Sequence, residues 1–192
     1  MLARVLLLCL MLACLSACQP SSKEAFEGTD ITGADFASGL ALTDHHGKAT
    51  SLTTFKGKVV VLFFGYTHCP DVCPTTMSDL AQAMKLLGKD ADRVQVLFVT
   101  LDPARDTPDV LAKYVPYFDP RFLGLSGSES QIADTARNFK ISASKQAPDA
   151  RGNYSIDHSA GIYVYDQQGK IRLYINYGTP AAAIAHDLRL LM

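Results

Sequence analysis

The chain has 192 residues, of which 48% are hydrophobic and 19% are charged. This length and this balance fit one globular domain with a single core rather than two domains. The 18 lysines and arginines nearly cancel the 19 acidic residues, and the chain has no basic cluster of the kind that follows a phosphate backbone. We therefore expect no nucleic-acid partner.

The N-terminal residues have the pattern of a secretory signal peptide. Arg4 precedes an uncharged, apolar stretch from Val5 to Ala17. As a helix this stretch would be about 20 Å long, which is too short to cross a hydrocarbon core of about 30 Å. Small residues before Cys18 are typical of a cleavage site. We therefore expect residues 1–17 to be a signal and the mature chain to be exported.

The motif LSAC at residues 15–18 resembles a bacterial lipobox. The resemblance implies cleavage before Cys18 and acylation of Cys18. The domain would then be anchored to a bacterial membrane, in the periplasm or outside the cytoplasmic membrane. The alternative is cleavage at a nearby site that leaves Cys18 unmodified. Residues 18–38 are predicted to contain Cys18 and a flexible tether of about fifteen to twenty residues that reaches about 50 Å when extended, and residues 39–192 are predicted to be the folded domain.

Two short segments, Leu40 to Thr43 and Thr50 to Leu52, flank the polar turn DHHGK and predict a small hairpin. His45 and His46 lie in this turn. Two adjacent histidines can recruit a metal ion, but adjacent side chains in a strand or turn point apart. We therefore interpret both histidines as turn residues.

The next segment contains a strand, a loop with two thiols and a helix. The apolar run VVVLFF at residues 59–64 predicts a strand that is buried on both faces. A loop with Cys69 and Cys73 follows it. We expect Pro74 to occupy the first position of an amphipathic helix, which ends at Gly88.

The two cysteines stand four positions apart at the start of this predicted helix. The helix dipole and free N–H groups there lower thiol pKa values, and thiolates bind metals and form disulfides. The C-x-x-x-C spacing is one residue longer than the C-x-x-C of dithiol oxidoreductases, which favours a metal. A stabilising disulfide or two buried thiols are the open alternatives. His68, next to Cys69, either promotes thiolate formation or is a loop residue, and we favour the loop residue.

A second buried strand is predicted at VQVLFVT, residues 94–100, and the helix before it makes a parallel βαβ crossover. The motif DPARDTP at residues 102–108 follows this strand, and its Asp102, Pro103, Arg105 and Asp106 lie at the edge where open α/β sheets place their sites. In the alternative, Asp106 or Thr107 caps a helix that begins at Pro108, and half of the motif has no chemical role. Both interpretations are open.

Further along the chain, Pro116 is expected to disturb the helix that begins at Pro108, and a third strand begins at Phe122. Ser128 and Gln131 then predict a capping box at the start of another helix, which runs through residue 139.

The C-terminal part begins with residues 140–153, which are polar and contain Pro and Gly and therefore predict an exposed, mobile loop. A strand through Tyr165 follows, then a hairpin partner and a last helix that starts at residues 179–180. His158 lies just before the strand, where a lone histidine is ordinarily a satisfied polar residue. Asp157 is a candidate to hold its ring by a hydrogen bond.

The order of these elements predicts an α/β thioredoxin-like fold with an N-terminal β-hairpin extension. The segment YTHCPDVCPTT around the two cysteines resembles the signature of the Sco/SenC family, and TLDPARDTP and DHSAGIYVYD resemble two further segments of it. The resemblance implies the same fold. It also implies a copper site formed by Cys69, Cys73 and His158, with His158 where thioredoxin relatives have a cis-proline.

Two thiolates and one imidazole suit Cu(I), and they also suit Cu(II) or zinc. The resemblance implies a copper metallochaperone that helps to assemble the dinuclear copper centre of cytochrome c oxidase, with oxidase subunit II and other copper chaperones as partners. The alternative is a thiol-disulfide oxidoreductase that reduces the cysteines of that centre or acts in redox defence. A structural zinc site requires four ligands, and the sequence offers three.

Overall fold

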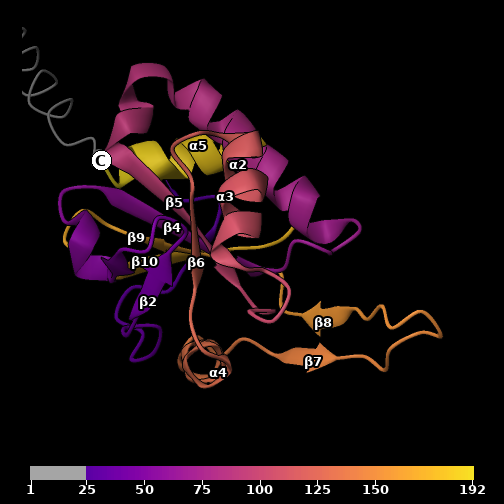
Figure 1. Ribbon diagram of the computed structural model, residues 1–192. Coiled ribbons are helices and arrows are strands. Elements are labelled where there is room, and N and C mark those ends of the chain that lie inside the picture. The colour runs from indigo at the N-terminus through magenta and orange to yellow at the C-terminus, as the bar shows by residue number, and fades with distance from the viewer. Residues whose placement is uncertain (1–24) are drawn as a thin grey trace, which may run out of the picture.

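The computed structural model describes residues 25–192 (Figure 1). The predicted signal, the lipobox-like motif and Cys18 lie outside the described residues. An eight-stranded sheet in the order β1-β10-β9-β4-β5-β6-β2-β3 forms the centre of the domain. Its strands are β1 (Thr29–Asp30), β2 (Leu42–Asp44), β3 (Ala49–Thr50), β4 (Val59–Gly65), β5 (Val94–Thr100), β6 (Leu123–Ser126), β9 (Ile162–Tyr165) and β10 (Ile171–Ile175).

Four α-helices of the described residues pack on this sheet. They are α2 (Val72–Leu87), α3 (Pro108–Phe118), α4 (Glu129–Asn138) and α5 (Ala181–Leu190). None of the helices in residues 25–192 is long and apolar enough to cross a membrane.

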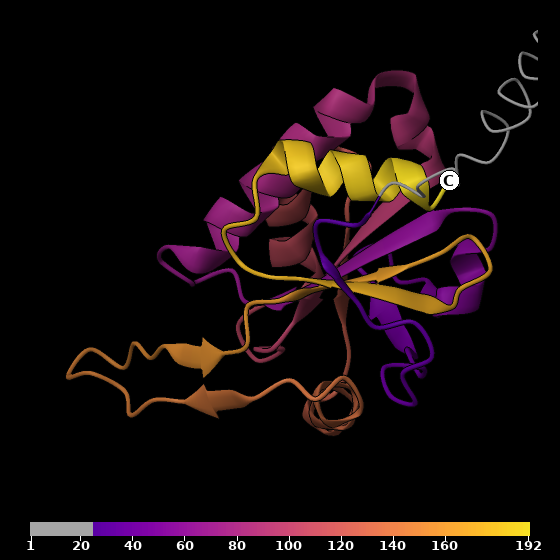
Figure 2. The ribbon, with the colours of Figure 1, turned by 180° about the vertical axis from the view of Figure 1, so that it is seen from behind.

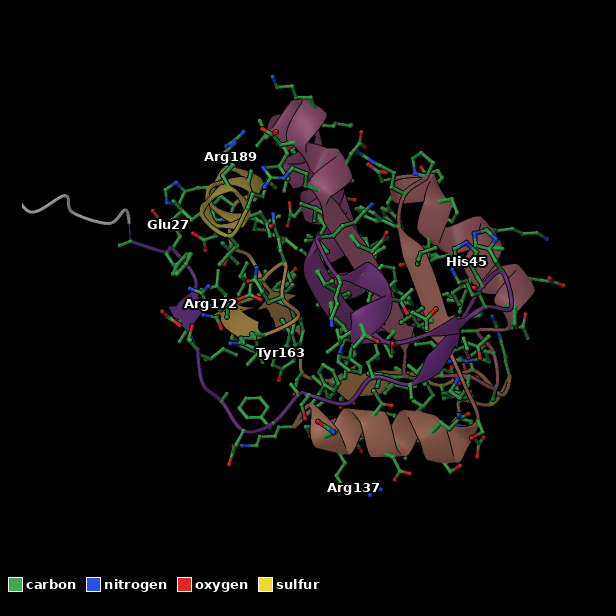
Figure 3. All side chains as sticks on the ribbon, turned by 90° about the vertical axis from the view of Figure 1, so that its left-hand side faces the viewer. Glu27, His45, Arg137, Tyr163, Arg172 and Arg189 are labelled. Carbon is green, nitrogen blue, oxygen red and sulfur yellow. The ribbon has the colours of Figure 1, made fainter. Side chains whose placement is uncertain are left out.

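The central strands β4 and β5 are parallel, and every residue of both is buried. Val59, Val61 and Phe63 belong to a core with α2, α3 and α5. The alternate residues of β4 belong to a second core with α4 on the opposite face, where the Tyr163 hydroxyl donates to Phe139 O at 2.5 Å (Figure 3). Burial on both faces explains the unbroken apolar runs. The predicted thioredoxin-like α/β fold, with the β2/β3 hairpin ahead of it, is therefore confirmed.

Some predicted boundaries of the elements are wrong by a few residues. The helix α2 begins at Val72, so Pro74 is its third residue rather than its first. Pro116 lies inside α3, which continues to Phe118. Leu52 belongs to a 3-10 turn and not to the hairpin strand β3. The capping box at the start of α4 is confirmed.

The N-terminal segment at residues 25–38 packs on the domain. Its strand β1 pairs with β10, and the backbone N–H groups of Glu27 and Gly28 donate to the buried carboxylate of Asp187 at 2.9 and 2.8 Å. The folded domain therefore begins near residue 25 rather than residue 39, and the prediction of a flexible tether is wrong for residues 25–38.

Two further strands, β7 (Ala143–Lys145) and β8 (Ile156–His158), form a separate two-stranded antiparallel sheet. We call residues 142–159 the ribbon; it projects from the body of the domain (Figures 1 and 2). The prediction of a loop over residues 140–153 is wrong for β7, although all three of its residues are exposed as expected. His158 ends β8 and therefore belongs to the ribbon.

Candidate metal centre

Three elements bring the predicted ligands together. Cys69 lies in the loop after β4, Cys73 in the first turn of α2 and His158 at the end of β8. The two sulfurs and one imidazole nitrogen lie within 4.8 Å of one another, and Cys73 Sγ is 3.3 Å from His158 Nε2. Both cysteines are free thiols. Within the described residues, this is the one group of three His, Cys, Asp or Glu side chains close enough to hold a metal ion.

This arrangement fits a single metal ion. Metal bonds to sulfur and imidazole nitrogen are about 2.0 to 2.3 Å long, so ligand atoms around one ion lie about 3 to 4 Å apart. The three atoms need only small movements to reach that spacing. Two sulfurs and one imidazole are soft to borderline ligands, which suit copper or zinc.

The Cys73 thiol is completely buried, whereas Cys69 and His158 are half-buried. Burial raises the pKa of the Cys73 thiol well above its usual value, despite a hydrogen bond with the backbone of Tyr66. The prediction that the helix N-terminus lowers thiol pKa values is therefore wrong for Cys73. A bound metal ion favours the thiolate, so metal binding at this thiol is coupled to loss of its proton.

A backbone carbonyl sets the orientation of the His158 ring. His158 Nδ1 lies 2.9 Å from Ser159 O, and since a carbonyl oxygen only accepts, Nδ1 carries the proton and donates it. In the neutral ring Nε2 then presents its lone pair towards Cys73. Asp157 accepts from Gln146 Nε2 at 2.7 Å, so the predicted bond from Asp157 to the ring is wrong.

A buried carboxylate holds the loop that carries the thiols. Asp106 accepts from the N–H of Thr67 at 3.0 Å, from its hydroxyl at 2.5 Å and from the hydroxyl of Thr100 at 2.6 Å. Thr107 caps α3 by accepting from Val110 N. The motif after β5 therefore serves both purposes: its Thr caps a helix and its second Asp anchors the thiol loop.

The space left for Cys73 depends on Gly65, which the sequence did not single out as part of the site. A Cβ atom on Gly65 would lie 2.9 Å from Cys73 Sγ and 2.9 Å from Phe98 Cε2. Both distances are shorter than van der Waals contacts of about 3.5 to 4.0 Å. A side chain at this position would therefore displace the sulfur or the phenyl ring.

The other histidines in the sequence lie outside the three-ligand group. His68 is an exposed loop residue whose Nδ1 is 3.1 Å from Thr67 Oγ1. His45, labelled in Figure 3, is buried and accepts from Gly124 N at 3.0 Å, which makes it a structural turn residue. Its ring centroid lies 4.1 Å from that of His46, so the expectation that the two rings point apart is wrong.

The metal site opens on one side to the surface. A cleft of about 420 Å³ is lined by residues of the thiol loop and the ribbon, Cys69 and His158 among them. Cys73 lies behind Cys69 and is not part of the lining. The cleft gives an incoming ligand access to an ion at this position.

A sequence model of the SCO1/SenC family matches residues 28–192. The mitochondrial SCO2 homolog of Bos taurus is 36% identical over 89% of this chain and 64% of its own length, so the chain spans somewhat less than two thirds of that relative. Among solved structures, copper-bound ScoI of Bradyrhizobium japonicum is 38% identical, with a TM-score of 0.73 over 88% of this chain and 100% of ScoI. A SCO1/SenC family lipoprotein of Bacillus anthracis is 26% identical, with a TM-score of 0.72 over 87% of this chain and 99% of that protein. The chain belongs to the SCO1/SenC family.

Proposed function

We propose that this chain is a copper metallochaperone that binds copper through Cys69, Cys73 and His158 and delivers it during assembly of the dinuclear copper centre of cytochrome c oxidase. The observation that carries the proposal is the convergence of two sulfurs and one imidazole nitrogen within 4.8 Å. Copper-bound ScoI, a relative with the same fold, supports the choice of metal.

Delivery of copper requires a site that an acceptor can reach. Three protein ligands leave one side of the ion free, and the cleft beside Cys69 and His158 reaches that side. A ligand of the acceptor binds there first and the protein ligands then leave one by one, so copper moves by ligand exchange without a change in oxidation state. Subunit II of the oxidase is the proposed acceptor, and other copper chaperones are proposed donors.

The proposed location is the outer side of a bacterial membrane, with a lipid on Cys18. The lipobox-like motif LSAC supports this, as does the description of the Bacillus anthracis relative as a lipoprotein.

A thiol-disulfide oxidoreductase is the second candidate function. It is favoured by one observation: the two thiols lie close together, with Cys69 accessible from the cleft. Dithiol exchange needs the two sulfurs but not an imidazole, so His158 separates the two functions.

The test is His158→Ala in the reduced, soluble domain. We expect Cu(I) affinity, measured by competition with a chromophoric chelator, to fall by at least about 100-fold. Removal of a residue that only hydrogen-bonds to a metal ligand already lowers metal affinity by about 10- to 100-fold, and His158 is proposed to be a ligand itself. The cysteine pair of the variant should still form and break its disulfide. The control is His68→Ala, which removes an exposed histidine beside Cys69 and should leave the affinity unchanged.

Two results would count against the metallochaperone. Copper affinity equal to that of the unaltered protein would exclude His158 as a ligand. Loss of copper binding in a variant that still supports oxidase assembly in cells would show that the thiols alone perform the function.

A further inference from the structure

The metal ligands belong to two separate units of the fold. Cys69 and Cys73 lie on the body of the domain, whereas His158 lies on the ribbon, whose strands form no ladder with the central sheet. The distance between the imidazole and the thiols therefore depends on whatever fixes the ribbon to the body.

Tyr154, two residues before β8, contacts the loop after β5 at several points. Its hydroxyl donates to Asp102 Oδ1 at 2.8 Å, and its carbonyl oxygen accepts from Arg105 Nη1 at 3.0 Å. The Arg105 guanidinium lies over the Tyr154 ring, 3.5 Å from its centroid. Lys145 of β7 contacts the same ring with its ammonium group at 3.7 Å.

The loop side of this contact is itself firmly held. Asp102 is buried, its backbone N–H donates to Thr100 Oγ1 at 2.9 Å, and its carboxylate pairs with Arg105. Arg105 therefore has its charge compensated by Asp102 and its flat face covered by Tyr154. A planar guanidinium can pair with the carboxylate, lie flat on the ring and donate to the Tyr154 carbonyl oxygen at the same time, whereas the compact ammonium group of a lysine cannot make all three contacts together.

This contact between Tyr154 and Arg105 lies close to His158, both along the chain and through space. Four residues of extended chain separate Tyr154 from His158, which corresponds to about 13 Å, and Ile156 between them is buried in the core. The Tyr66 ring connects the two ends through space. Its centroid is 5.9 Å from the Arg105 guanidinium carbon and 6.0 Å from the His158 ring.

We propose that Arg105 and Tyr154 form a latch that holds the ribbon in place, so that the His158 imidazole faces the two thiols. They are positioning residues, because neither contributes an atom to the three-ligand group. The effect on copper rests on the proposed function, in which His158 is a copper ligand. The geometric part of the inference concerns the copper-free protein and stands without it.

The test compares three substitutions of the latch with two controls. Tyr154→Leu removes the ring and the hydroxyl, Arg105→Lys keeps the charge but loses the planar face, and Tyr154→Phe removes the hydroxyl alone. The controls are Tyr117→Leu, at a tyrosine that is 85% exposed on α3, and Arg121→Lys, at an arginine paired with Asp119 away from the ribbon.

In the copper-free protein the readout is the nuclear Overhauser effect between the His158 and Tyr66 rings. We expect it to be lost in Tyr154→Leu and Arg105→Lys and retained in Tyr154→Phe and both controls. Circular dichroism should show that all variants are folded. An unchanged effect in Tyr154→Leu and Arg105→Lys would overturn the latch, whatever the protein binds.

In the copper-bound protein the readout is Cu(I) affinity. Tyr154→Leu and Arg105→Lys should weaken it by about 10- to 100-fold, as removal of groups that orient a ligand typically does. The same substitutions in a His158→Ala background should cause no further loss, since the latch acts through His158. An equal loss in both backgrounds would overturn the latch. If His158→Ala alone leaves copper affinity unchanged, the proposed ligand set is wrong. The nuclear Overhauser measurement then still tests whether Arg105 and Tyr154 hold the ribbon in place.

Discussion

Gly65→Ala tests whether the position of the Cys73 sulfur limits metal binding. The backbone of Gly65 is in the extended strand β4, so alanine adopts it without strain and the whole effect is steric. The added methyl would lie 2.9 Å from Cys73 Sγ, 2.9 Å from Phe98 Cε2 and 3.1 Å from Phe63 Cε1. To restore van der Waals contact of about 3.5 Å, the sulfur and the ring must each retreat by about half an ångström or more.

The cost of this crowding follows from the burial of all four residues. Overpacking of a core typically costs about 1 to 3 kcal/mol, which in a domain of this size lowers Tm by about 3 to 10 °C. The sulfur also moves relative to His158 Nε2, its neighbour at 3.3 Å. We therefore expect Cu(I) affinity to fall by about 10-fold, comparable to other disturbances of ligand orientation.

Thermal unfolding and chelator competition measure the two effects. Gly39→Ala is the matched control, because its added methyl meets only the flexible amide of Asn138 at 3.1 Å. The control should differ from the unaltered protein by less than about 0.5 kcal/mol. If Gly65→Ala has normal stability and normal copper affinity, the site is loose enough to absorb a methyl group, and the steric reasoning is refuted.

Three further predictions concern the anchor, the core and the thiol loop. Cys18→Ser should leave a full-length, unlipidated precursor on immunoblots, and normal processing would exclude the lipobox. The reduced domain, treated with a copper chelator, should keep its circular dichroism spectrum and a cooperative unfolding transition, because both cores consist of protein side chains alone. An unfolded metal-free protein would instead indicate a structural metal. Asp106→Ala should lower the free energy of unfolding, measured in urea, by about 3 kcal/mol, since it leaves the Thr67 and Thr100 donors without their charged acceptor. A loss below about 1 kcal/mol would contradict the role of Asp106 as an anchor of the thiol loop.

The central part of the fold is local in sequence and was therefore predictable. Residues 59–64 show one unbroken apolar run, and burial on both faces follows from that run alone. The cap at Thr107 and the capping box at Ser128 are also local, because the donor and acceptor stand three residues apart. The choice of Cys69, Cys73 and His158 came from a family resemblance, and the structure brings these side chains together.

The features that were missed depend on partners far away in the chain. Residues 25–38 look like a polar tether, but Asp187, about 160 positions later, holds their backbone. The ribbon strand β7 has three exposed residues and no alternation of apolar side chains, so its pairing with β8 leaves no signal in the sequence. The pKa of Cys73 follows from desolvation in the packed core and not from its position at a helix end.

The corrected N-terminal boundary changes the distance that we expect between the cleft beside the metal site and a membrane. With the domain folded from residue 25, only the six residues 19–24 separate it from the proposed lipid on Cys18, and the extended distance from residue 18 to residue 25 is at most about 25 Å rather than about 50 Å. The C-terminus lies on the side of the molecule opposite the ribbon (Figures 1 and 2), and Ala25 lies against the C-terminal helix α5, with its carbonyl oxygen 3.2 Å from His186 Nε2. In the proposed lipid-anchored form, an anchor on that side would hold the body near the bilayer, with the ribbon and His158 on the far side of the domain. In that form the cleft would be reached by an acceptor whose copper site projects from the membrane surface and not by one whose copper site lies at the lipid interface.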